Sequence, residues 1–399
     1  MRRVVVTGLG VVSALGPDAA SFWKALCEGR SAIGPLQGFP DGATTVQVAA
    51  QARDFDPAAH FDAKQIDLLD RFSQFALVAA RQAVRESGAP LGERAAVVMG
   101  SAMGGKITED QGFHQLYAEG KKRFSPFTIP RSMPNAAASQ ITMEFGITGP
   151  GLTIATACAA ATHAVGFAFQ MVRSGLVDVA LAGGSEAPFS LGSLKGWEGV
   201  RVMAPDTCRP FSRDRKGMVL GEGAAVLVLE ADEPARARGA RIFAEVAGFG
   251  MSSDAGHITI PSQAGAARAM QAALQDASLA PETIGYINAH GTGTEANDRT
   301  ETQAIRQVFG TYAERLAVSS TKSMHGHALG ASGALELVAT ALALHRGLLP
   351  PTANFTAAGH SCDLDYLPNH AREFQVEAAL SNSFAFGGLN AVLCMRRAV

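Results

Sequence analysis

Residues 153–184, TIATACAAATHAVGFAFQMVRSGLVDVALAGG, contain the pattern that decides the fold. An apolar, β-rich run at 153–157 and a second apolar run at 178–184 flank a helical segment that is rich in small residues. Strand-like runs on both sides of a helix predict a parallel β–α–β unit with buried strands. A single cysteine, Cys158, lies where the first run ends and the helical pattern begins.

The same alternation continues along the chain. Apolar runs at 3–10 and 95–102 flank a helical pattern at 70–88. In the second half, 284–290 follows a helical segment and 315–322 precedes another. The sequence therefore predicts an α/β fold built from two similar halves.

A polar connector at 233–241 separates the two halves. We accordingly expect an N-terminal half, 1–240, that carries the cysteine, and a C-terminal half, 241–399. Two stretches without a clear pattern, 103–150 and 186–216, carry prolines and scattered charges. We expect them to be loop-and-helix insertions that shape a pocket.

The composition is that of a globular protein, with 47% hydrophobic and 18% charged residues among 399. A net charge of −2 gives no reason to expect a nucleic acid or an anionic membrane as partner. The five cysteines are widely spaced and form no CxxC pair, which excludes a disulfide framework and a zinc-finger pattern. The glycine-punctuated N-terminal run predicts a core strand and not a secretory signal, so we expect a cytoplasmic protein.

Cys158 has two interpretations. Buried cysteine is common as a small hydrophobic residue without chemistry. A cysteine at a helix N-terminus, however, faces free N–H groups and a partial positive charge, which lower the pKa of a thiol and can bind an oxyanion. The residues around the cysteine leave both interpretations open.

A second motif, NAHGTGTEAND at 288–298, places His290 at the end of a predicted strand. A single histidine at such a place is more often structural than catalytic. The hydroxyl groups of Thr292 and Thr294 beside it are suited to bind a polar ligand tail.

A third motif, SSTKSMHGHALGASGALE at 319–336, brings Lys322, His325 and His327 together just before a helix that contains Glu336. A loop between an apolar strand and an apolar helix is unlike a solvated surface loop. A lysine close to a histidine favours the neutral imidazole, which donates one hydrogen bond without carrying charge.

The fourth motif is NSFAFGG at 382–388, in which Phe384 and Phe386 stand on a glycine turn. Such a turn is suited to a mobile gate or to an oxyanion hole made of backbone N–H groups. The alternative is a β-turn with core aromatics.

One cysteine and two histidines in separate motifs are compatible with three chemistries. Cys158, His290 and His327 could hold zinc with one open position. A cysteine–histidine pair could run a thiol hydrolase. A thiol with two neutral histidines could run acyl transfer coupled to decarboxylation, with the histidines stabilising an enolate.

The motifs TACAAATHA, NAHGTGTEAND, STKSMHGHALGASGALE and NSFAFGGLNAVL stand in the order found in a known family. The chain resembles the β-ketoacyl-acyl-carrier-protein synthases of the elongating branch. VVVTGLGVVSALG and CRPFSRDRKGMVLGEGAAVLVLE match this family too, so the resemblance covers essentially the whole chain. LKGWEGVRVMAPDTCRPFS, residues 194–212, and KSMHGH are most similar to the nodulation protein E-like paralogues.

The resemblance implies a thiolase-type fold, with two duplicated βαβαβ halves in a five-layer α-β-α-β-α arrangement. It implies an acyltransferase that condenses an acyl group with malonyl-acyl carrier protein, with loss of CO₂, in fatty-acid or polyketide chain elongation. The substrates are carried on the phosphopantetheine of acyl carrier protein, and no metal or diffusible cofactor is needed. A homodimer is the usual assembly, and a heterodimer with a related subunit is the alternative.

The resemblance also implies roles for matched residues. Cys158 would accept the acyl chain as a thioester. His290 and His327 would bind the malonyl thioester carbonyl and stabilise the enolate. The backbone N–H groups of Cys158 and Phe386 would hold the oxyanion, and Phe386 with Phe384 would form a gate over the acyl pocket.

Four further residues match the family's pattern. Lys322 and Glu336 would order the two histidines. Thr292 and Thr294 would bind the phosphopantetheine arm.

The sequence departs from the family's pattern at several positions. His325 stands where many members have threonine, and Ala385 and Leu389 interrupt the usual FGFGGTN turn. Ala385 is expected to stiffen the gate because it lacks the backbone freedom of glycine. Asp67 and Leu68 replace basic residues at which the acidic carrier docks, which indicates a specialised enzyme. The remaining basic candidates for docking are Lys64, Arg71, Arg201 and the run 121–123.

Three related classes of protein fit the sequence less well. A thiolase needs a second reactive cysteine, and Cys394 lies in a strand-like run without the required glycine cluster. A synthase that uses coenzyme A primers pairs its histidine with asparagine, whereas His327 is present here. A non-condensing partner resembling chain-length factors would lack the nucleophile Cys158, yet it remains the alternative to an active synthase.

Overall fold

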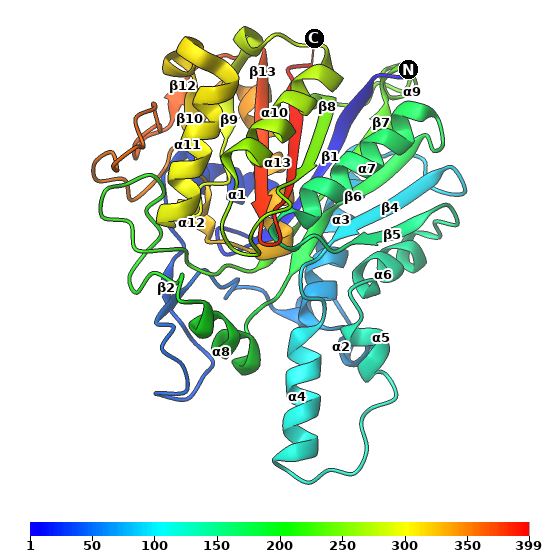
Figure 1. Cartoon of the computed structure of the whole chain (residues 1–399). Coiled ribbons are helices and arrows are strands. Elements are labelled where there is room, and N and C mark those ends of the chain that lie inside the picture. Colours follow the sequence, from blue (N-terminus) through cyan, green and yellow to red (C-terminus); the bar gives the residue numbers. More distant parts are fainter. Residues whose placement is uncertain (399) are drawn as a thin grey trace.

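A single ten-stranded sheet runs through the protein in the computed structural model, which describes residues 1–398 (Figure 1). The strands of its N-terminal part are β1 (Val4–Ser13), β4 (Ala95–Gly100), β5 (Gly151–Ile154), β6 (Val179–Glu186) and β7 (Gly223–Ala231). The strands of its C-terminal part are β8 (Ala244–Ser253), β9 (Ile284–Asn288), β10 (Ala317–Ser319), β13 (Ala378–Ala385) and β14 (Leu389–Arg396).

The strand order shows that the fold is duplicated. The order across the sheet is β5-β4-β6-β7-β1 and then β8-β14-β13-β9-β10. If the five strands of each half are numbered one to five along the chain, both halves have the order three, two, four, five, one from the outer edge of the sheet inward. In both halves the first two of these pairings are parallel and the last two are antiparallel. The predicted α/β fold of two similar halves is confirmed.

The two halves join through a short ladder between β1 and β8. Only three residue pairs make it, and they run antiparallel from Val4 opposite Val246 to Val6 opposite Ala244. The connector at 233–241 begins as helix α9 (Asp232–Ala237). The domain boundary at residue 240 stays a prediction.

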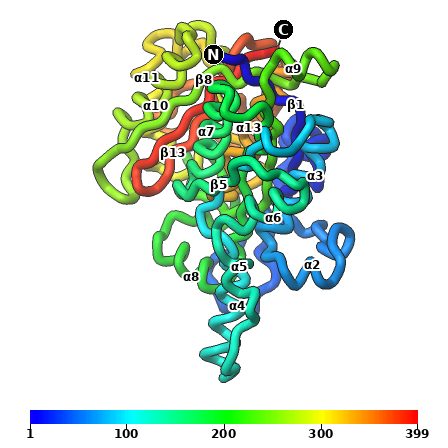
Figure 2. The backbone as a smooth tube through the Cα atoms, turned by 90° about the vertical axis from the view of Figure 1, so that its right-hand side faces the viewer, coloured from blue at the N-terminus to red at the C-terminus, as the bar shows by residue number. Residues whose placement is uncertain are grey.

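Helices cover the sheet in layers (Figures 1 and 2). On one side α3 (Arg71–Ser87) packs against the N-terminal strands, and on the other side α10 (Gln263–Ala277) and α11 (Glu295–Phe309) cover the C-terminal strands. Helices α7 (Ala160–Ser174) and α13 (Ser332–Arg346) lie together between the two halves. This arrangement matches the expected five layers.

The sequences of α7 and α13 suit helices that are buried between two layers of strands. Every residue of α13 from Ser332 to Leu344 is buried, since GALELVATALAL is apolar around nearly the whole helix. Both central helices end at a glycine in the left-handed conformation, Gly175 with φ 82° and Gly347 with φ 64°. Glycine ends a helix in this way without steric cost, so each helix stops at the edge of its layer.

Both predicted insertions contain helices as well as loops, and they reach one end of the molecule, opposite the two termini (Figures 1 and 2). The first insertion contains α4 (Lys106–Tyr117), α5 (Thr128–Ser132) and α6 (Ala136–Phe145), and the second contains α8 (Leu191–Val200). The remaining elements are α1 (Ala19–Cys27), β2 (Gly34–Pro35), β3 (Val48–Ala49), α2 (Ala63–Leu68), α12 (Lys322–His325), β11 (Leu348–Leu349) and β12 (Arg372–Glu373). Among the described residues, no helix combines the length and the apolar character needed to cross a membrane.

Candidate active site

Cys158 lies in a single 3-10 turn, Ala157–Ala159, between the end of β5 and the start of α7. Ala157, directly before it, has a positive φ of 49°, which costs a residue with a side chain free energy of about 1–3 kcal/mol. The thiol is buried, with Cys158 only 7% exposed. The turn therefore holds the cysteine in one fixed place at the head of a central helix.

The thiol of Cys158 is neutral in the resting protein. Burial raises its pKa to about 11, and this effect outweighs the Lys322 ammonium and the backbone N–H groups of Phe386 and Cys158, which lower it. The N–H groups at the helix start lower the cysteine pKa, as expected, but the net shift is upward because the loss of hydration destabilises a thiolate by more than these groups stabilise it. Both N–H groups favour negative charge near the sulfur.

His290 follows β9, and a carboxylate on α11 fixes its backbone. The N–H groups of His290 and Gly291 both donate to Glu301, at 2.8 Å each. Asn382 on β13 donates to the same carboxylate at 3.1 Å. Sequence analysis missed Glu301, whose only signal was an acidic residue nearly two turns into the helix that follows the histidine loop.

A fully buried ammonium group lies beside the His290 ring. The Nζ atom of Lys322 lies 3.4 Å from Nδ1 of His290 and forms an ion pair with Glu336. An ammonium can only donate, so Nδ1 accepts and the ring proton lies on Nε2. The expected ordering of His290 by Lys322 and Glu336 remains a proposal, and this contact supports it.

His327 faces His290 across the site. Its Nδ1 lies 2.8 Å from the Ser332 hydroxyl, and its backbone N–H donates to the Val219 carbonyl at 2.7 Å. The centroids of the two imidazole rings are 5.5 Å apart and the rings are nearly perpendicular, at 84°. Burial and the Lys322 ammonium hold the pKa of each ring well below 6.5, so both rings are neutral at pH 7.

The other histidine of the motif at 319–336, His325, is also buried and neutral. Burial lowers its pKa to about 3, its Nε2 lies 2.9 Å from the Thr321 hydroxyl, and its ring lies near Phe22 on α1. It lines neither of the cavities at Cys158. Within residues 1–398, no group of three or more histidine, cysteine, aspartate or glutamate side chains is arranged to hold a metal ion.

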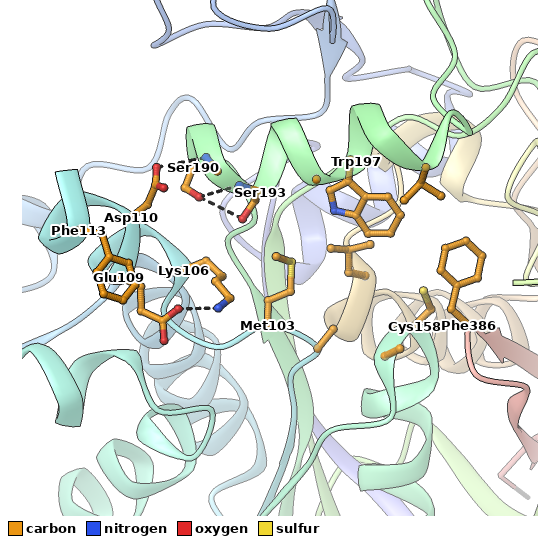
Figure 3. A pocket seen from close by; sticks show the side chains of 16 residues that line it. Met103, Lys106, Glu109, Asp110, Phe113, Cys158, Ser190, Ser193, Trp197 and Phe386 are labelled. Carbon is orange, nitrogen blue, oxygen red and sulfur yellow. Dashed lines mark hydrogen bonds and ion pairs between the residues drawn. The ribbon is translucent and has the colours of Figure 1, made fainter. Parts of the chain in front are cut away.

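Two cavities meet at Cys158, and both have Phe386 and Trp197 in their walls. One, of about 370 Å³, also contains His290 and His327. The other, of about 550 Å³, extends from Cys158 past Met103 between α4 and α8 (Figure 3). The ring of Phe386 lies 6.2 Å from that of Trp197, measured between centroids, at the junction of the two cavities.

The other candidate residues border the smaller cavity. Thr292 and Thr294 line it, with their hydroxyl oxygens 2.9 Å apart, and Thr294 also caps the N-terminus of α11. Phe384 lies beside His290, with ring centroids 6.0 Å apart. Two left-handed glycines follow Phe386, which gives the turn after it the conformation that only glycine adopts freely.

Glu186, at the end of β6, is a second buried carboxylate that sequence analysis missed. It accepts hydrogen bonds from the Ser101 hydroxyl at 3.0 Å and from the N–H groups of Ala102, Met103 and Gly330 at 2.6, 3.1 and 3.0 Å. Burial raises its pKa to about 7. It thereby ties the loop that carries Met103, a wall of the larger cavity, to the turn before α13.

One basic docking candidate is already engaged within the fold. Arg71 donates to both oxygens of Glu222, at 3.0 and 2.9 Å, and to the Ala52 carbonyl at 2.9 Å. Its guanidinium also lies over the ring of Phe75. Arg71 is therefore a structural residue, contrary to its candidacy for docking, whereas Lys64, Arg201 and the run 121–123 are exposed.

Comparison with known proteins agrees with this architecture. The sequence model of the β-ketoacyl synthase N-terminal domain matches residues 1–235, and that of the C-terminal domain matches residues 243–356. Nodulation protein E of Rhizobium sp. (strain N33) is 48% identical over 400 residues, which cover 99% of each chain. The 3-oxoacyl-[acyl-carrier-protein] synthase 2 of Coxiella burnetii is 43% identical over 408 residues, also covering 99% of each chain.

A solved structure extends the agreement to three dimensions. The ishigamide ketosynthase/chain length factor structure has a TM-score of 0.95 at 39% identity and covers the whole of both chains. Both halves of the fold, the two family models and the full-length relatives lead to one conclusion. The chain belongs to the β-ketoacyl synthase family, and its fold is thiolase-like.

Proposed function

We propose that the protein is an acyltransferase that condenses an acyl group, held on Cys158, with malonyl-acyl carrier protein to give 3-oxoacyl-acyl carrier protein and CO₂. The observation that carries this proposal is the placement of one thiol and two neutral imidazoles where two cavities meet. One cavity accommodates the acyl chain and the other the carrier's arm.

In the first step, the sulfur of Cys158 attacks the thioester carbonyl of the acyl carrier. The N–H groups of Cys158 and Phe386 stabilise the oxyanion, as an oxyanion hole does in acyl transfer. The carbonyl then reforms, the bond to the carrier sulfur breaks, and the thiol proton goes to the leaving carrier thiolate. Acyl-Cys158 and a free carrier thiol result.

In the second step, His290 and His327 donate hydrogen bonds from Nε2 to the carbonyl oxygen of the malonyl thioester. The bond to the carboxylate carbon breaks, CO₂ leaves, and its electron pair forms an enolate. The enolate carbon attacks the acyl-Cys158 carbonyl and displaces the cysteine sulfur, which takes up one proton. Loss of CO₂ drives the reaction, so neutral imidazoles suffice and no strong base is needed.

The carrier's phosphopantetheine arm would lie in the smaller cavity, against the hydroxyls of Thr292 and Thr294. Phe386 and Phe384 would gate the junction. No metal or diffusible cofactor takes part in this proposal. A cytoplasmic location stays a prediction.

We expect the protein to act as a homodimer. Strand β5 is an outer strand of the sheet and pairs only with β4, and its Leu152 is 46% exposed. An open edge of this kind is suited to pairing with a second copy. A heterodimer with a related, non-condensing subunit is the alternative, and the similarity to a ketosynthase/chain length factor structure supports considering it.

The decisive experiment incubates the protein with malonyl-carrier and a labelled acyl-carrier. Mass spectrometry should find the acyl group on Cys158 and a product extended by two carbons. Absence of acylation and of extended product would overturn the condensing function and favour the non-condensing alternative. Equal product formation by Cys158→Ala would overturn the proposal that the acyl group is held on Cys158.

A further inference from the structure

The larger cavity changes in character along its length (Figure 3). Near Cys158 its walls are apolar, with Met103, Trp197 and Phe386. Beyond Met103 its walls carry charged and hydroxyl groups beside the ring of Phe113. The polar residues of this outer part are Lys106, Glu109, Asp110, Ser190 and Ser193.

Two facing helices supply these polar groups. On α4, Lys106 Nζ forms an ion pair with Glu109 at 2.5 Å. At the N-terminus of α8, the Ser190 hydroxyl donates to the Ser193 hydroxyl at 3.0 Å. Asp110 connects the helices by accepting the N–H of Gly192 at 3.3 Å.

The groups differ in how firmly they are held. Ser190 and Ser193 are more than nine-tenths buried. The Lys106 and Glu109 side chains keep 39% and 35% of their surface exposed, so their ion pair is weak and can exchange for a ligand. The outer part of the cavity therefore offers an exchangeable donor and exchangeable acceptors together.

A fully saturated acyl chain fits the inner part and not the outer part. Methylene groups gain free energy by leaving water against apolar walls. Against Lys106 and the carboxylates, the same groups would remove water from charges and give no hydrogen bond in return. A hydroxyl both donates and accepts, so it can bond to the ammonium and to a carboxylate at once.

We propose that the acyl group bound at Cys158 carries a hydroxyl in its distal part, and that Lys106 with Glu109 selects for it. This inference rests on the proposed function, since it assigns the acyl chain to the larger cavity. Its test measures binding and does not require turnover.

The test uses acyl-pantetheine amides, which bind but cannot transfer their acyl group. Calorimetry with a saturated series first finds the length at which affinity stops rising, which marks the charged wall. At that length, the analogue with a terminal hydroxyl should bind about tenfold tighter than the methyl-ended one. Lys106→Met keeps the aliphatic stem and removes the charge. In this variant, and in Glu109→Gln, the ratio of the affinities for the hydroxyl-ended and methyl-ended analogues should be close to one.

Lys24→Met, an exposed lysine on α1, is the matched control and should keep the ratio of the unaltered protein. A ratio of one in the unaltered protein, or an unchanged ratio in Lys106→Met, would overturn the inference. Absence of binding by both analogues would also overturn it. Failure of the condensing function is read separately, from acylation of Cys158 by a short-chain carrier that does not reach Lys106.

Discussion

The turn that carries Cys158, Ala157–Ala159, has a counterpart in the second half of the chain. The turn Leu329–Ala331 leads into α13 as the first leads into α7, and both turns are single 3-10 turns. Each begins with a left-handed residue that is not glycine: Ala157 with φ 49° and Leu329 with φ 45°. Both halves of the chain therefore have a strained, left-handed residue at the same position of the turn.

The two turns differ in their middle residue, which is Cys158 in one and Gly330 in the other. The N–H of Gly330 donates to Glu186, and a Cβ at this position would lie 2.3 Å from the backbone N of Ala102. The first turn therefore carries a thiol side chain. The second turn has no side chain at this position, so its backbone packs directly against the loop of Ala102 and Met103, which lines the larger cavity. The same turn carries the proposed nucleophile in one half and allows close packing in the other.

The largest expected effect comes from making the two turns alike. Cys158→Gly removes the nucleophile, so condensation should fall by at least about a thousandfold. Release of CO₂ from malonyl-carrier should persist, because we assign it to the two histidines. Both rates can be followed in one assay, by product mass and by CO₂. Condensation that survives in this variant would contradict the assignment.

The second effect concerns pH. The condensing activity needs neutral His290 and His327, whose pKa values lie well below 6.5, so it should stay level as the pH falls from about 7.5 to about 6. Activity should fall only at lower pH, as the imidazoles take up protons.

In Lys322→Met combined with Glu336→Gln, the ammonium no longer lowers the histidine pKa values. The acid limb of the rate–pH profile should therefore move to higher pH. The paired substitution avoids a buried unpaired charge. An acid limb that stays in place would show that burial alone keeps the rings neutral.

A smaller effect is expected at the glycine of the second turn. Gly330→Ala forces a Cβ against Ala102 and Glu186, so the free energy of unfolding should fall by about 1–3 kcal/mol, measured by urea denaturation. Gly199→Ala, on α8 with no atom near its Cβ position, is the control and should be neutral or stabilising. Equal stability of the two variants would mean that the second turn has room to adjust.

The smallest effect is expected at the strained residue itself. Ala157→Gly relieves the positive φ but adds freedom to the unfolded chain, so the free energy of unfolding should change by less than about 1 kcal/mol. Condensation should fall only a few-fold, through looser placement of Cys158. A loss as large as that of Cys158→Gly would mean that the left-handed alanine is itself essential to the site.

The sequence was sufficient for the architecture and for the main residues of the site. Strand-like runs around helical patterns predicted the two similar halves, because buried parallel strands and their covering helices have distinct periodicities. Cys158, His290 and His327 could be singled out since each ends a strand-like run or stands in the loop that follows one. The resemblance then assigned their roles, which the experiments above test.

What the sequence could not supply depends on three-dimensional burial. The helix start suggested a lowered pKa for Cys158, but the depth of the site has the opposite effect and raises it. Glu186 holds backbone N–H groups from distant segments, and Glu301 holds those of the histidine loop before its helix. Neither kind of contact produces a periodic pattern in the sequence. Arg71 looked available for a carrier because its partner, Glu222, lies far along the chain.

The packing of α7 against α13 between the two halves has a consequence for synthesis on the ribosome. The five strands of the first half are complete at Ala231, before any strand of the second half exists. Helix α7 packs on β4 and β6 of its own half, but its opposite apolar face stays uncovered until α13, which ends at Arg346, has been made. A nascent chain of this length exposes a surface that favours aggregation. Chaperone binding should therefore be strongest while the ribosome synthesises the segment between Ala231 and Arg346.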